Sequence, residues 1–71
     1  MTPYSENSGV VAYAIHDTYI DVEMRSGSVY RYSEAVTGKD SVKEMKRLAL
    51  AGKGLATYIS KYARGAYERI V

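Results

Sequence analysis

The stretch "YIDVEMRSGSVYRYS", Tyr19–Ser33, predicts a β-hairpin from which the rest of the fold can be worked out. Apolar and polar residues alternate strictly over "YIDVEM", which is typical of a strand with one buried face. In "RSGS", Gly27 can adopt the positive φ that a tight hairpin turn needs. The returning segment "VYRYS" carries Tyr30 and Tyr32 on one face. We therefore expect two antiparallel strands joined by a short turn.

The segment before the hairpin predicts one more strand. "VVAYAI", residues 10–15, is apolar and rich in β-branched residues, and "HDT" after it supplies turn residues. Residues 1–9 are mostly polar, and we expect them to form a flexible N-terminal segment. Residues 10–71 are then a single domain, because a chain of 71 residues buries only one small core.

Two helices are expected after the hairpin, over residues 42–51 and from about Leu55 to Arg64. We expect a loop over "EAVTGKD", then a capping box formed by Ser41 and Glu44 at the start of the first helix. Apolar positions recur at helical spacing in both segments. They are Val42, Met45, Leu48 and Ala49 in the first, and Leu55, Tyr58, Ile59 and Tyr62 in the second.

Glycines are expected to end both helices, at Gly52 and Gly65. The tail "AYERIV" has a β-branched end that would close as a short strand. The predicted fold is α+β: a three- to four-stranded antiparallel meander sheet covered on one face by two helices.

Composition excludes several kinds of site. The chain has no cysteine and a single histidine, His16, which excludes disulfides and a zinc site of ordinary composition. The N-terminus lacks the basic and apolar regions of a signal peptide, and no apolar run approaches the length of a membrane span. We expect a cytoplasmic protein with no metal, no cofactor and no membrane contact.

Charge is unevenly distributed, although the net formal charge is only +2. Residues 1–38 carry a net charge of about −3 and residues 39–71 one of about +5. The second half is therefore the one expected to meet an anion. All eight aromatic residues are tyrosines, which suit half-exposed surfaces and stacking sites as well as cores.

The turn "AGKGL" between the two helices has two interpretations. A helix beginning after Gly54 presents free backbone amides and the positive end of its dipole, and Lys53 adds an ammonium group, which together favour a phosphate site. Alternatively, Gly52 and Gly54 serve only the geometry of a helix–helix joint. Both interpretations use the same glycines.

Tyrosines and one arginine complete the set of candidate ligand-binding residues. Tyr58 and Tyr62 follow the glycine turn and offer rings on which a nucleobase can stack, with Arg64 in the same helix as a further cation. They also fit the apolar stripe of that helix. Tyr30 and Tyr32 on the sheet form a second candidate platform, although the sheet half is acidic.

No catalytic signature is present, and we expect no enzyme. "AGKGLAT" lacks the glycine spacing and the Lys-Ser/Thr pair of a nucleotide-hydrolysis loop. His16 and Asp17 are adjacent in a predicted turn, while Asp21 and Glu23 share a strand face that we expect to be solvated.

The order of these motifs resembles the KTSC domain, a small module named from the C-terminus of some lysyl-tRNA synthetases and also found as free-standing bacterial and phage proteins. The counterparts here are "IDVEMRSGSVYRY" with Gly27, Tyr30 and Tyr32, then Val36, the helix 42–51, "GKGL", Tyr58, Ile59 and "YERIV". The resemblance covers roughly residues 10–71 and implies a small binding module.

Three departures from the KTSC pattern affect the likeness. No proline follows Val36, Gly52 stands where a serine precedes the lysine, and Ala56 replaces an asparagine common just before the isoleucine region. If that asparagine serves a shared binding site, the site is altered in this chain.

The sequence leads to three functional hypotheses. The first is a non-catalytic binding module for a phosphate-bearing ligand, with a nucleotide favoured over extended nucleic acid because the net charge is weak. Such a module would act by sequestering a nucleotide signal, as a phage counter-defence protein. The alternative is a protein–protein interaction or oligomerisation module without a small ligand, and self-association to a homo-oligomer would support so small a core. An RNA-binding accessory domain, implied by the synthetase connection of the KTSC family, ranks third.

Overall fold

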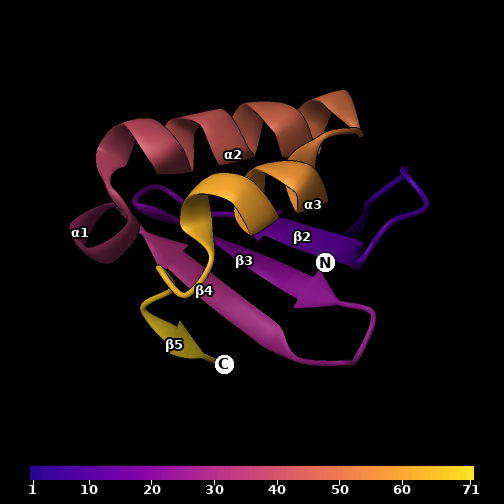
Figure 1. The fold of residues 1–71 in the computed structure, drawn as a ribbon, viewed down its shortest axis with the longest axis horizontal. Coiled ribbons are helices and arrows are strands. Elements are labelled where there is room, and N and C mark those ends of the chain that lie inside the picture. Colours follow the sequence, from indigo (N-terminus) through magenta and orange to yellow (C-terminus); the bar gives the residue numbers. More distant parts are fainter.

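The computed structural model describes all 71 residues and shows an α+β domain with one sheet and one helical layer (Figure 1). The sheet has five antiparallel strands that neighbour one another in chain order. They are β1 (Thr2–Pro3), β2 (Val10–Ile15), β3 (Tyr19–Met24), β4 (Val29–Ser33) and β5 (Arg69–Ile70). The predicted α+β class and meander topology are confirmed, and the tail forms the expected short strand.

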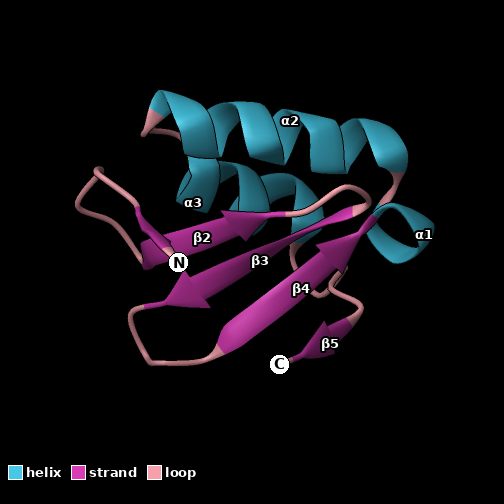
Figure 2. Cartoon of the chain, turned by 180° about the vertical axis from the view of Figure 1, so that it is seen from behind, coloured by secondary structure: helices cyan, strands magenta, loops and turns pink.

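The helices cover one face of the sheet and leave the other open (Figure 2). They are α1 (Glu34–Thr37), α2 (Lys39–Ala51), α3 (Leu55–Tyr58) and the π-helix η1 (Ile59–Ala63), which continues α3 without a break. The two predicted helices correspond to α2 and to the joined α3 and η1. The single helical turn α1 lies in the segment predicted to be a loop.

The hairpin has the predicted register and supplies the centre of the core. Ile20 pairs with Tyr32 and Val22 with Tyr30, and Gly27 has a φ of 98° in the turn. The side chains of Ile20 and Val22 are fully buried on the face beneath the helices. Because successive side chains of a strand point to opposite faces, the polar residues next to Ile20 and Val22 in β3 lie on the open face.

The core is a single cluster of twelve buried residues between the two layers. Its members come from both layers and are Tyr4, Val10, Tyr13, Ile20, Val22, Tyr32, Val42, Met45, Ala49, Leu55, Ile59 and Ala63. Burial raises the pKa of Tyr32 from 10.0 to about 12, with smaller contributions from Tyr30 and Tyr67.

Residues 1–9 are part of the domain, in contrast to the flexible segment expected from the sequence. Thr2 and Pro3 pair with Tyr13 and Ala12 and form the fifth strand, which was not predicted. Tyr4 is buried and packs edge-on against Tyr13, with ring centroids 6.4 Å apart. Polar composition was misleading here because a single tyrosine anchors the segment in the core.

The predicted capping box is wrong. Helix α2 begins at Lys39, so Ser41 lies inside its first turn. The N-cap residue is Gly38, which has no side chain to cap the helix. A serine caps α1 instead, since the Val36 N–H donates to the Ser33 Oγ at 3.3 Å.

The π-helix changes which residues of the second helix face the core. The predicted stripe ended at Tyr62, but Tyr62 is 70% exposed and Ala63 is buried in its place. A π-helix bonds residue i to i+5 and so has more residues per turn than an α-helix. Over Ile59–Ala63 this advances the inward position by one residue.

Shortening one buried methyl-bearing side chain is expected to destabilise the domain measurably. Ile20→Val removes a methylene at a fully buried position and should lower the free energy of unfolding by about 0.5–1.5 kcal/mol. Its cross-strand partner Ile15 is 38% exposed, so Ile15→Val should cost less than about 0.5 kcal/mol. Urea denaturation of both variants checks the difference, and equal losses would contradict the difference in burial between the two positions.

Alkaline conditions are expected to destabilise the fold through Tyr32. Because the folded state holds the phenolic proton of Tyr32 more tightly than the unfolded chain does, this contribution is present below about pH 10 and is lost as the pH rises toward the folded-state pKa of about 12. Urea midpoints measured at about pH 9 and about pH 11 should fall more in the native chain than in Tyr32→Phe. An identical fall in both would argue against Tyr32 as the responsible group.

Candidate functional site

The glycine turn between α2 and α3 has the backbone geometry that its sequence predicts. Gly52 adopts a left-handed conformation with a φ of 80°, and its N–H donates to the carbonyls of Leu48 and Ala49 at 3.0 and 3.1 Å. Gly54 is also left-handed, with a φ of 87°. Residues with a side chain rarely adopt such positive φ angles, so the joint itself requires both glycines.

The N-terminal segment occupies the amides expected to bind a phosphate. The Gly54 N–H donates to the Glu6 Oε1 at 2.9 Å, and the Leu55 N–H donates to the Tyr4 Oη at 2.9 Å. The Ser5 Oγ donates to the Gly52 carbonyl at 3.2 Å, in space that a Cβ on Gly52 would fill. A carboxylate of the chain itself therefore lies where a phosphate oxygen was expected.

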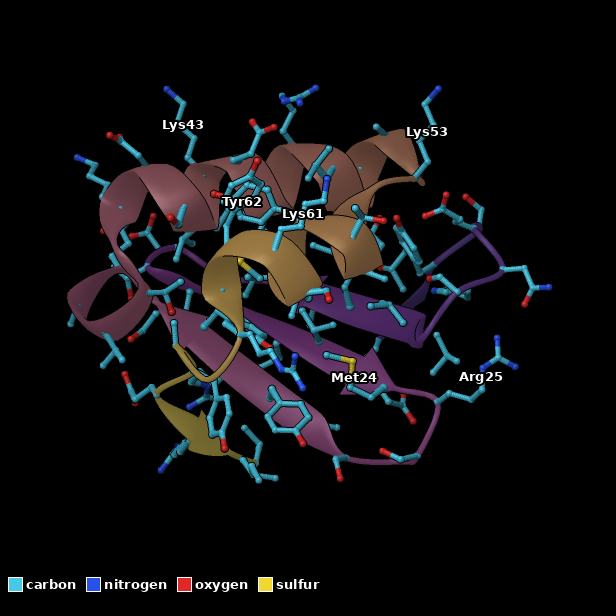
Figure 3. All side chains as sticks on the ribbon, viewed as in Figure 1. Met24, Arg25, Lys43, Lys53, Lys61 and Tyr62 are labelled. Carbon is cyan, nitrogen blue, oxygen red and sulfur yellow. The ribbon has the colours of Figure 1, made fainter.

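Tyr4 and Glu6 act together at this turn. The Tyr4 hydroxyl accepts from the backbone of Leu55 and donates to the Glu6 Oε1 at 3.2 Å. Burial is the main cause that raises the pKa of Tyr4 above its usual value of 10.0. The Gly54 and Leu55 amides are thus used within the chain, and the exposed ammonium of Lys53 points away from the helices (Figure 3).

The predicted sheet platform is not open to a ligand. Tyr30 and Tyr32 do share a face, but that face lies under the helices, and Tyr32 is 2% exposed. Tyr67 packs against both rings, at centroid distances of 4.7 and 6.4 Å. Both tyrosines serve packing.

The two helix tyrosines form a pair at the surface. Their ring centroids are 5.1 Å apart and the ring planes are inclined by 46°. Tyr58 is half-buried against the core, while Tyr62 is exposed. The predicted site residues therefore do not form one site. They belong to the helix joint (Gly52, Lys53, Gly54), to the tyrosines packed under the helices (Tyr30, Tyr32), to the surface pair (Tyr58, Tyr62) and to a separate position, Arg64.

Arg64 lines a groove that the sequence did not reveal. The groove has a volume of about 370 Å³ and lies between the sheet and the α3–η1 helix. Its lining comes from four segments and consists of Gly9, Val10, Met24, Ala56, Ile59, Ser60 and Arg64. Figure 3 shows Met24 at the end of β3 on the groove side. Only Arg64 among these was a predicted ligand-binding residue, because nothing local in the sequence links residues 9, 24 and 56.

A second hollow, with a volume of about 710 Å³, lies where β4 ends and α1 begins. Its arginine is already neutralised, because Arg31 donates from Nε and one terminal nitrogen to the two Asp21 carboxylate oxygens at 2.9 and 3.0 Å. The same guanidinium lies over the Tyr19 ring, 4.1 Å from its centroid. Asp21 is thus buried and paired rather than solvated as predicted.

Two further observations bear on the kind of site present. No group of three histidine, cysteine or carboxylate side chains lies close enough together to hold a metal ion. None of the helices has the length and apolar character that crossing a bilayer requires.

Comparison of the chain with protein-family models, curated proteins and solved structures found no match in any of the three. The resemblance to the KTSC domain therefore stays a prediction. Ala56, which the predicted resemblance aligns with an asparagine, lines the groove.

Removing the hydroxyl of Tyr4 should destabilise the domain, because the buried Leu55 N–H would lose its acceptor. We expect Tyr4→Phe to lower the free energy of unfolding by about 1–3 kcal/mol. Tyr13→Phe is the matched control, since Tyr13 is equally buried and its hydroxyl makes no hydrogen bond within the chain. Chemical denaturation of both variants measures the effect. A Tyr4→Phe protein as stable as Tyr13→Phe would mean that the turn does not depend on the N-terminal segment.

Proposed function

We propose that this protein is a non-catalytic binding module for a small phosphate-bearing ligand, with a nucleotide as the favoured class, and that the ligand occupies the groove rather than the glycine turn. The observation that carries the proposal is a groove with an apolar floor and a guanidinium at one end. Small-ligand sites commonly combine apolar walls with a few polar groups that fix orientation.

The floor of the groove suits a flat, weakly polar group. Val10 and Ile59 are buried core residues, and the flexible thioether of Met24 can adapt to a planar ring. A volume of about 370 Å³ is near the lower end for ligand pockets and favours a compact ligand over an extended chain.

The polar end of the groove suits an anion. Arg64 is exposed and makes no ion pair, so its planar guanidinium is free to bind a phosphate through two hydrogen bonds. The neighbouring Ser60 hydroxyl offers a further donor.

Two small residues keep the groove open. Gly9 needs no unusual backbone angle, and no atom lies within 4 Å of the place where its Cβ would be. Neither conformation nor packing therefore requires glycine at this position. Ala56 similarly leaves space where a larger side chain would project.

Nothing along the groove supports chemistry on a bound ligand. Its lining holds no histidine or carboxylate that could act as a general acid or base. Binding without turnover is the activity required for sequestering a nucleotide signal, which remains our hypothesis for the biological role.

A thermal-shift screen against mono-, di- and cyclic nucleotides tests the proposal. A ligand at about one hundred times its Kd stabilises the folded state by about 2.7 kcal/mol, so Tm should rise by several degrees. Arg64→Glu should abolish the shift by repelling phosphate, and Ala56→Trp should abolish it by filling the groove. Lys53→Glu is the control, with the same charge change at the glycine turn, and should leave the shift intact.

The same variants show how the proposal would fail. Loss of the shift in Lys53→Glu, with Arg64→Glu unaffected, would return the site to the glycine turn. No shift for any nucleotide would contradict a nucleotide-binding role and favour the second candidate below.

An oligomerisation module is the second candidate, favoured by the edge of the sheet. Strand β5 is only two residues long, and Ile70 and the adjoining Val71 are 54% and 59% exposed. Exposed β-branched residues on an unpaired edge are suited to adding a strand from another chain.

A further inference from the structure

Basic side chains are concentrated in one continuous segment of the chain. Residues 39–64, which form α2, the glycine turn, α3 and η1, carry seven basic side chains and two carboxylates. The basic residues are Lys39, Lys43, Lys46, Arg47, Lys53, Lys61 and Arg64. The rest of the chain carries three arginines, Arg25, Arg31 and Arg69, and six carboxylates. A weak net charge thus conceals a strongly basic segment, residues 39–64, and an acidic remainder of the chain.

Most of these basic side chains are free to meet an external anion. Arg47 pairs with Glu44 at 2.5 Å, and the Lys46 Nζ donates to the Asp17 carbonyl at 2.9 Å. The other basic residues of the layer make no ion pair. Lys43, Lys53 and Lys61 project from the helices on the side away from the sheet (Figure 3).

An exposed aromatic ring lies beside one of these lysines. Tyr62 is 70% exposed, and Figure 3 shows it over the helical layer next to Lys61. Tyr58 supports it from the core side at a centroid distance of 5.1 Å. The π-helix keeps this ring outside, since an α-helical turn would direct position 62 toward the core.

We propose that this surface, which we call the outer helix face and define by Lys43, Lys53, Lys61 and Tyr62, binds single-stranded nucleic acid. The lysines attract the phosphates, and one base stacks on Tyr62. A duplex is disfavoured because its bases already stack on one another and present no free ring face. This function is separate from ligand binding in the groove and does not depend on it.

The composition of the surface favours nucleic acid over a lipid bilayer. Within residues 39–64 only Leu50 and Tyr62 are large hydrophobic residues with high exposure. Two such side chains provide little apolar area for insertion among headgroups, whereas ring stacking needs only one aromatic face.

Fluorescence anisotropy with a labelled oligo(dT) 12-mer and the full chain tests the proposal. We expect binding whose affinity falls with salt with a logarithmic slope of about −2, as three neutralised phosphates predict. Tyr62→Ala should weaken binding by about fivefold or more through the lost stacking, while Tyr62→Phe should retain it. Lys61→Glu should weaken binding strongly. Arg69→Glu, with the same charge change on β5, should have little effect.

The remaining outcomes are equally informative. Ala56→Trp should leave oligonucleotide binding unchanged, so the fate of this proposal is distinguishable from that of the groove. Absence of binding, or binding that is indifferent to Tyr62→Ala and equally strong for dextran sulfate, would overturn it. Binding to vesicles containing phosphatidylserine, without oligonucleotide binding, would overturn it in favour of a membrane surface.

Discussion

The buried start of helix α3 is the constraint on which much of this structure depends. Leu55 is fully buried, its backbone N–H has no acceptor within its own helix, and a buried donor without a partner is costly. The N-terminal segment supplies the acceptor, because the Leu55 N–H donates to the Tyr4 hydroxyl. The neighbouring Gly54 N–H donates to the Glu6 carboxylate. The same contact draws Thr2 and Pro3 alongside β2 as an edge strand. One requirement of the backbone therefore sets both the sheet edge and the occupancy of the glycine turn.

These internal hydrogen bonds make the glycine turn a poorer ligand site than the groove. The Gly54 amide of the turn already binds a carboxylate, whereas Arg64 at the groove beneath α3 and η1 makes no ion pair. The groove also depends on the N-terminal segment, because Gly9 lines it directly before β2. The layer above is a different kind of surface, with unpaired lysines and an exposed tyrosine. The proposed small-ligand and nucleic acid sites thus share no residue.

Particular residues show why prediction succeeded in one half of the chain and not in the other. The β3–β4 hairpin was predictable because its alternation and its turn are local. The ion pair between Asp21 and Arg31 follows from the same register, so it was also predictable from the sequence, although it was not predicted. The contact between Glu6 and Gly54 joins residues 48 positions apart, and no local pattern announces it. Tyr62 was assigned to the core because the spacing assumed an α-helix throughout.

The sequence by itself determined the α+β class, the order of the strands, the two main helices and the glycines at their joint, because hydrophobic periodicity and turn chemistry act over a few residues. Only the tertiary structure decided which donors stay free, which tyrosines are exposed and where the groove lies. Those properties depend on packing between segments distant in the chain. Glu6 binds the Gly54 amide of the predicted phosphate site, Tyr32 is buried and Tyr62 is not, because the partners of each residue lie elsewhere in the sequence.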